Sequence, residues 1–157
     1  MFKRILVAID SSDYSQQVVP AAIEMARKFQ ADVFVLHVSE HDHGRAAVYS
    51  TETPAEATLL VAGAVKAFRA AGIPARAEVH DVAAGHVAKD IVESAGDNGS
   101  DLIVMGSRGL SDIQGLLLGS VTHKVMQLAK VAVLVVRGPI PVKAGQPVSQ
   151  AVPAGAY

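Results

Sequence analysis

The chain has 157 residues, with 14 basic and 15 acidic side chains, so its formal charge is −1. This balance provides no basic field that would attract nucleic acid or an anionic membrane. Half of the residues are hydrophobic, 4% are aromatic and none is cysteine. The composition therefore predicts one compact domain and excludes thiol nucleophiles, disulfides and zinc–cysteine sites.

The N-terminus favours a cytoplasmic protein. Lys3 and Arg4 precede an apolar run at residues 5–9, which stops at Asp10. That run is too short for the apolar region of a signal peptide. No stretch approaches the length of about 18 apolar residues that a membrane span needs.

Short apolar runs alternate with longer amphipathic stretches along the chain. The apolar runs are typical of buried strands and cover residues 2–9, 32–39, 101–105 and 131–136, and residues 75–82, which alternate in part, form a further predicted strand. Helical spacing predicts helices over residues 15–29, 55–71, 85–95 and 120–128. The connections are too long for hairpins, so the alternation predicts a parallel sheet with helices on both faces.

Turn-forming residues indicate where several of these elements begin and end. Ser12 or Asp13 is the expected N-cap of the first helix. Pro54 opens the second helix and Gly72 closes it, while Gly96 closes the third. The third strand alternates only in part and is expected to be less buried than the others.

The end of the chain differs from the rest. Residues 138–157 hold four of the seven prolines and show neither a helical nor a strand period. Proline limits regular structure, so this Pro/Ala/Gly-rich segment is predicted to be an extension or partner-binding arm. The domain itself is expected to span residues 1–137.

Two clusters of small residues bracket a loop after the fourth strand. The first cluster is Met105, Gly106, Ser107, Arg108 and Gly109, and the second, nine residues later, is Gly119, Ser120, Val121 and Thr122. Glycine lets backbone N–H groups approach an anion, and a helix start adds unpaired N–H donors and a positive dipole end. Ser120 and Thr122 also carry hydroxyl donors. This stretch predicts a phosphate-binding cradle at the carboxyl ends of the strands, where open α/β sheets bind ligands.

Other nucleotide-binding motifs are missing. A P-loop needs a lysine after its glycines, and no such lysine follows the glycines here. A Rossmann dinucleotide site needs G-x-G-x-x-G after the first strand, where residues 10–13 read Asp-Ser-Ser-Asp instead. A general base would have to come from Asp10, Asp13 or His123, and the spacing requires none of them. Efficient catalysis is therefore not expected.

The pattern Gly106-x2-Gly109-x9-Gly119-Ser120 resembles the nucleotide-binding signature of the ATP-binding branch of the universal stress protein family. Further segments resemble the family's strands and its third-helix glycine: residues 4–10, Leu36-His37-Val38, Gly85 and residues 132–136. The resemblance covers residues 1–137. It implies a single-domain, doubly wound α/β fold whose five parallel strands have the order 3-2-1-4-5.

The resemblance also implies roles for particular residues. Asp10 would contact the adenosine with Ala8 and Ile9 beside it, and Val38 would provide an apolar wall and backbone groups for adenine. The ribose and phosphates of ATP would be lined by Met105, Gly106, Ser107, Arg108 and Gly109. The phosphates would be held by Gly119, Ser120, Val121 and Thr122. Mg²⁺ is expected to bridge the phosphates, because a bound triphosphate usually carries it.

The expected function is that of an ATP-binding, nucleotide-dependent stress-response regulator. The resemblance implies a homodimer through the last strand, from Val131 to Val136, whose apolar edge favours pairing with a second chain. The tail could instead fold back over that edge and leave a monomer.

Several alternatives stay open at this point. The protein could be a slow ATPase or autophosphorylating enzyme with Ser120 or Thr122 near the γ-phosphate, or a nucleotide-free dimeric scaffold. Asp10 could serve only as a helix cap. A loop metal site from His37, His41 and His43 is a weaker alternative.

Overall fold

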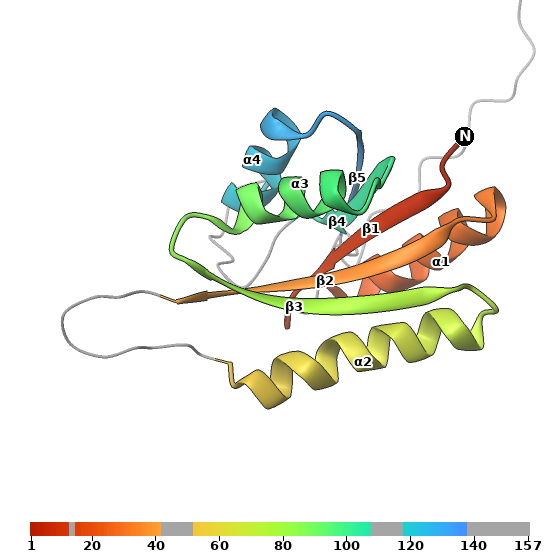
Figure 1. Cartoon of the computed structure of the whole chain (residues 1–157), viewed down its shortest axis with the longest axis horizontal. Coiled ribbons are helices and arrows are strands. Elements are labelled where there is room, and N and C mark those ends of the chain that lie inside the picture. The colour runs from red at the N-terminus through yellow and green to blue at the C-terminus, as the bar shows by residue number, and fades with distance from the viewer. Residues whose placement is uncertain (13–14, 42–51, 108–117, 138–157) are drawn as a thin grey trace, which may run out of the picture.

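The computed structural model describes residues 1–12, 15–41, 52–107 and 118–137. Its elements in chain order are β1 (Arg4–Ile9), α1 (Ser15–Phe29), β2 (Asp32–His41), α2 (Pro54–Ala70), β3 (Ala75–Ala83), α3 (Val87–Asp97), β4 (Leu102–Gly106), α4 (Ser120–Leu128) and β5 (Ala132–Val136). The five strands form one parallel sheet in the order β3-β2-β1-β4-β5 (Figure 1). This confirms the predicted α/β fold. Asp13, His43, Arg108, Gly109 and residues 138–157 lie outside the described residues.

Two apolar cores lie on opposite faces of the sheet, because successive side chains of a strand point to opposite sides. Ile5 and Val7 of β1 belong to the core that α1 and α2 cover. Leu6 of β1 belongs to the core that α3 and α4 cover. Both cores include residues of β2 and β4, so the central strands are buried on both faces. No described helix is long and apolar enough to cross a membrane.

The two edge strands are less buried than the central ones. Buried residues are absent from both β3 and β5, whereas four of the five residues of β4 are buried. The weaker burial predicted for β3 is therefore confirmed. The apolar strand β5 lies at the sheet edge, as expected from its place in the topology.

Each element end falls within two residues of its predicted position, and the differences at β2 and α3 have identifiable causes. β2 continues to His41 because its parallel pairing with β3 extends to that residue. Pro54 opens α2 and Gly72 follows it with φ +77°, as predicted. Gly96 does not close α3, because the helix includes it and runs on to Asp97. The left-handed turn comes instead at Gly99, where φ is +60°.

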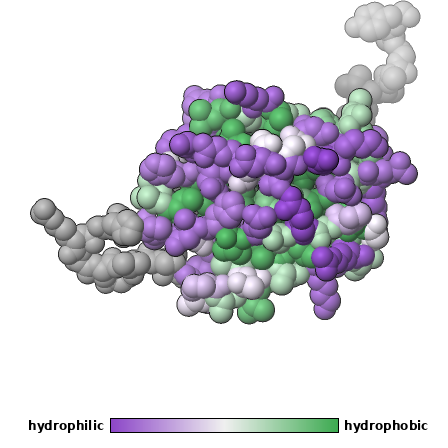
Figure 2. All heavy atoms as spheres, in the orientation of Figure 1, coloured by the Kyte–Doolittle hydropathy of each residue, from purple (hydrophilic) through white to green (hydrophobic). Residues whose placement is uncertain are grey.

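The first prediction concerns the core under α2. Phe68 is fully buried, so Phe68→Ala leaves a cavity and is expected to lower the free energy of unfolding by about 3–5 kcal/mol. Leu59 on the same helix is 73% exposed. Exposed hydrophobic side chains of this kind are not unusual here, since the face in Figure 2 carries hydrophobic residues between hydrophilic ones. Leu59→Ala is the matched control and should change the free energy by about 0.5 kcal/mol or less. Equal losses in chemical denaturation would contradict this packing.

A second prediction concerns the contact between β3 and α3. Burial lowers the pKa of His80, but hydrogen bonds and charge attraction from Asp90 and Glu78, at 2.7 and 3.2 Å, outweigh it and raise that pKa. A raised pKa in the folded state stabilises the protein fully below the unfolded pKa of about 6.5. This stabilisation is lost as the pH rises through the folded pKa.

His80→Gln should therefore lower the Tm more at pH 5.5 than at pH 8.5. Thermal unfolding of both proteins at the two pH values measures this difference. An equal effect at both pH values would show that protonated His80 does not stabilise the fold.

Candidate functional site

Asp10 follows β1 and organises the turn into α1. Its Oδ1 accepts hydrogen bonds from the Ser12 N–H at 3.1 Å, the Ser12 hydroxyl at 2.5 Å and the Ser15 hydroxyl at 2.7 Å. The Ser15 Oγ in turn accepts from the Asp10 N–H at 2.8 Å. The structure describes α1 from Ser15 onward, and the Ser12 carbonyl oxygen accepts from the Ser15 N–H. Asp13, the other predicted cap residue, lies outside the described residues. These contacts hold the half-buried Asp10 carboxylate at the end of β1.

His37 is a supporting residue that the sequence reasoning placed in the strand but gave no role at the site. The side chain is buried, and its Nδ1 lies 2.9 Å from the carbonyl oxygen of Ile9. A carbonyl oxygen only accepts, so Nδ1 carries the proton and donates it. Nε2 lies 2.5 Å from a carboxylate oxygen of Glu52, which precedes α2. The ring thus ties β2 to the peptide just before Asp10.

A metal site at the histidines finds no support in the described residues. His37 points inward to Ile9, and His41 pairs with Asp81 at 2.5 Å. His43 lies outside the described residues. The described part of the chain contains no group of three His, Asp or Glu side chains placed to hold a metal ion.

Hydrogen bonds join the end of β4 to the start of α4, although the two are separated by residues 108–117. The Gly119 N–H donates to the Ser107 carbonyl oxygen at 2.8 Å. The Thr122 hydroxyl donates to the Gly106 carbonyl oxygen at 2.9 Å. Ser107 also donates its N–H to the Val136 carbonyl oxygen at 2.8 Å, so β5 supports the same turn. The two clusters of small residues are therefore brought together.

The start of α4 is open to an anion. Gly119 is its N-cap, no side chain among the described residues caps it, and its first turn holds no acidic residue. The first N–H groups of a helix have no partner within the helix, and the dipole makes this end positive. Ser120 is exposed, whereas Thr122 is buried and its hydroxyl is committed to Gly106. The groups available to a ligand here are the backbone N–H groups and the Ser120 hydroxyl.

The sheet register places the remaining predicted residues at the same edge. Ala8 is paired with Met105 of β4, and Ile9 with His37 of β2. Val38 is half-buried and comes one residue later on β2, while Asp10 and Gly106 stand at the ends of their strands. The described positions of the predicted site therefore gather at the carboxyl ends of β1, β2 and β4 and at the start of α4. The figure of the fold shows this common direction of the strands (Figure 1).

Comparison with known proteins identifies the family. The model of the universal stress protein family matches residues 1–137. Universal stress protein YxiE of Bacillus subtilis is 35% identical to the chain over 87% of this chain and 100% of the relative. The solved structure of the Archaeoglobus fulgidus universal stress protein in complex with dAMP matches with a TM-score of 0.65 and 27% identity, covering 86% of this chain and 98% of its own.

A second solved structure, a universal stress protein in complex with cAMP, matches with a TM-score of 0.62 and 28% identity. It covers 86% of this chain and 97% of its own. The family match spans every strand and helix described above. The chain belongs to the universal stress protein family.

Proposed function

We propose that this protein binds an adenine nucleotide at the carboxyl edge of the sheet and acts as a nucleotide-dependent stress-response regulator. The nucleotide that we propose is ATP. The observation that carries the proposal is the uncapped start of α4, hydrogen-bonded against the end of β4. The similar structures in complex with dAMP and cAMP support an adenine nucleotide as the ligand.

The adenosine would lie against β1 and β2. Asp10 is held by Ser12 and Ser15 through Oδ1, and we assign its Oδ2 to a ribose hydroxyl. The half-buried side chains of Ala8 and Val38 would form the apolar wall of the adenine site. His37 keeps the Ile9 carbonyl fixed beside this wall.

The phosphates would lie at the start of α4. The N–H groups of Ser120 and Val121 would donate to phosphate oxygens, and the Ser120 hydroxyl would add a further donor. Thr122 would contribute its N–H, because its hydroxyl already donates to Gly106. Arg108 and Gly109 enter the proposal through the motif alone. Mg²⁺ would be carried by the phosphates, since the described residues contain no cluster of metal ligands.

Regulation would act through the segment between β4 and α4 and through β5. A nucleotide shifts an equilibrium only as far as it binds one arrangement more tightly than another. Ser107 contacts Val136 of β5, so the proposed phosphate site and the edge strand share one hydrogen-bonded turn. The proposal also includes homodimerisation through β5 and a location in the cytoplasm.

A pair of glycine variants tests the phosphate cradle. Gly119→Val places a branched side chain at the start of α4, where a phosphate would approach the N–H groups, and should weaken ATP binding at least about tenfold. Gly63→Val is the control, because Gly63 lies within α2 and a Cβ there meets nothing within 4 Å. Calorimetric titration of nucleotide-stripped protein with ATP and Mg²⁺ measures both affinities.

Circular dichroism and thermal unfolding first establish that both variants fold. Binding that survives in folded Gly119→Val would contradict the position of the phosphates. No heat of binding at millimolar ATP in the unaltered protein would overturn the proposal itself and favour a nucleotide-free scaffold.

A further inference from the structure

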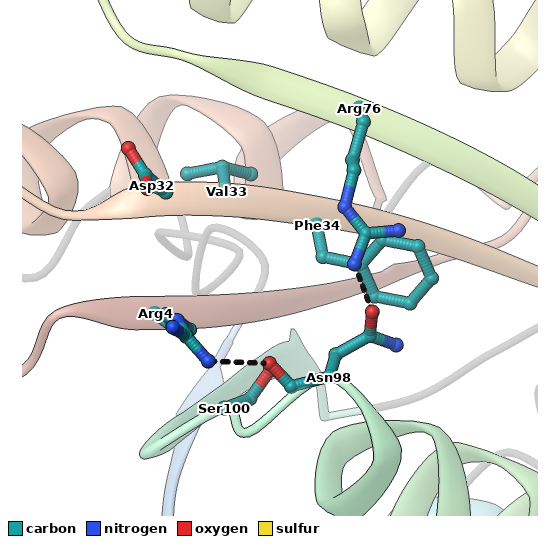
Figure 3. A pocket seen from close by; sticks show the side chains of 7 residues that line it. All are labelled: Arg4, Asp32, Val33, Phe34, Arg76, Asn98 and Ser100. Carbon is teal, nitrogen blue, oxygen red and sulfur yellow. Dashed lines mark hydrogen bonds between the residues drawn. The ribbon is translucent and has the colours of Figure 1, made fainter.

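Arginine side chains tie the elements together at the amino edge of the sheet. Arg76 lies 4.5 Å over the Phe34 ring and donates to the Asn98 side-chain oxygen, beside a pocket of about 260 Å³ (Figure 3). Arg4 donates to the Asn98 carbonyl oxygen at 3.4 Å. Arginine keeps its charge throughout the physiological pH range, so these contacts do not depend on protonation. At the carboxyl edge, a contact between elements is made by a histidine instead.

His37 lies between two hydrogen-bond acceptors. Its side chain is buried, and Nδ1 donates to the Ile9 carbonyl oxygen at 2.9 Å. Nε2 lies 2.5 Å from the Oε2 atom of Glu52, whose side chain is 13% exposed. A neutral ring carries one proton and Nδ1 uses it, so Nε2 would face the carboxylate with a lone pair. Two acceptors at this distance repel each other, so the contact requires a second proton between Nε2 and Oε2.

The second proton belongs on the histidine ring. Imidazole is a stronger base than a carboxylate, and the charged ring donates from both nitrogens. His37 is then an imidazolium paired with the Glu52 carboxylate, and both of its hydrogen bonds are charge-assisted. The contact between Nε2 and Glu52 therefore exists only while the ring is protonated.

The titratable groups around this pair have partners of their own. His37 is paired with Val79 of β3, and successive side chains of a strand point to opposite faces, so the residues flanking Val79 lie on the other face of the sheet. Ser39 adds a hydroxyl, 3.4 Å from Nε2. Glu52 is thus the described carboxylate that contacts the ring. The neighbouring groups and their partners are Asp10 with Ser12 and Ser15, His41 with Asp81, Glu56 with Thr53, and His80 with Asp90 and Glu78.

One peptide group, between Ile9 and Asp10, is held on both sides. Its carbonyl oxygen accepts from His37 at 2.9 Å, and its N–H donates to the Ser15 Oγ at 2.8 Å. Asp10 extends directly from this peptide group. Glu52 immediately precedes the N-cap residue of α2. The pair of His37 and Glu52 therefore links the start of α2 to the backbone that presents Asp10.

We propose that His37 is a positioning residue for the nucleotide, and that the proton on its Nε2 controls this role. The inference rests on the proposed function. With the proton present, Glu52 holds the ring and the ring holds the Ile9 carbonyl, so Asp10 is presented in one arrangement. Without the proton, the Nε2 lone pair faces the carboxylate, the contact with Glu52 is lost and the arrangement loosens. Nucleotide affinity therefore falls as the pH rises and this proton is lost.

NMR of the histidine rings in the ¹⁵N-labelled full chain tests the proton without any nucleotide. Long-range ¹H–¹⁵N spectra report whether each ring nitrogen carries a proton. In His37, Nδ1 should be protonated at both pH 5.5 and pH 8.5, whereas Nε2 should be protonated at pH 5.5 and bare at pH 8.5. Glu52→Gln removes the carboxylate that stabilises the charged ring, so Nε2 should lose its proton at a lower pH. A bare Nε2 at pH 5.5, or a protonated Nε2 at pH 8.5, in the unaltered chain would overturn the proposal.

ATP affinity tests the link to the nucleotide site. An amide at position 52 can accept from a charged ring or donate to a neutral one, so Glu52→Gln should keep the contact at both pH values. Calorimetry with ATP and Mg²⁺ should give equal affinities for Glu52→Gln and the unaltered chain at pH 5.5, and at least about threefold tighter binding by Glu52→Gln at pH 8.5. Comparison of two proteins at one pH cancels the titration of ATP itself. Glu93→Gln on α3, whose side chain is 60% exposed, is the matched control and should equal the unaltered chain at both pH values.

Two variants of His37 separate positioning from packing. His37→Asn keeps an N–H donor near the position of Nδ1, so its affinity for ATP should stay within about twofold of that of the unaltered chain. His37→Leu keeps the apolar bulk but has no donor, and should weaken ATP binding about tenfold. Circular dichroism first establishes that both variants fold.

The outcomes distinguish this role from the proposed function. Unchanged affinity in folded His37→Leu, equal weakening by both His37 variants, or the same affinity ratio for Glu52→Gln at both pH values would overturn the positioning role and leave the nucleotide site in place. No ATP binding by the unaltered chain would overturn the proposed function, and this role with it.

Discussion

All five strands run in the same direction, and the position of the candidate site follows from this constraint. The backbone groups of the inner strands are paired with neighbouring strands. Unpaired polar groups therefore collect where the strands begin and where they end, at the amino and carboxyl edges of the sheet. Asp10 and Gly106 stand at the carboxyl edge because their strands end there. Arg4 and Asp32 stand at the amino edge because theirs begin there. The sheet thus separates two polar regions, of different chemistry, by a buried apolar core.

Within the carboxyl edge, hydrogen bonds decide which groups remain for a ligand. The Thr122 hydroxyl and the Gly119 N–H are used to fasten α4 to the end of β4. These contacts fix the start of α4 in position. Because none of the described side chains caps that start, its backbone N–H groups favour an anion. Asp10 shows the same division: its Oδ1 organises the turn, and its Oδ2 is the atom that we assign to the ligand. One set of contacts therefore builds the scaffold and presents the remaining donors and acceptors.

The sequence predicted the strands, the helices and the strand order, because apolar runs and helical periods depend on local pattern and the order came with the family resemblance. It predicted the end of α3 wrongly. Glycine marks many helix ends but also fits inside a helix, and the closing turn at Gly99 lies against Arg4, far away in the chain. The contact of His37 with Ile9 depends on the register of β1 and β2, which no local pattern contains. The pair of His37 and Glu52 was missed for a related reason, because the two residues are 15 positions apart and belong to different elements of the fold.

The central claim is that an adenine nucleotide binds at the carboxyl edge of this sheet. The most direct test is NMR mapping of the amide signals of the full chain during titration with ATP and Mg²⁺. The account predicts that shifts concentrate at Asp10, Val38, Gly106 and Ser120, while the signals of Gly99 and Ser100 stay unchanged. Shifts confined to the amino edge, or no shift at millimolar ATP, would contradict it.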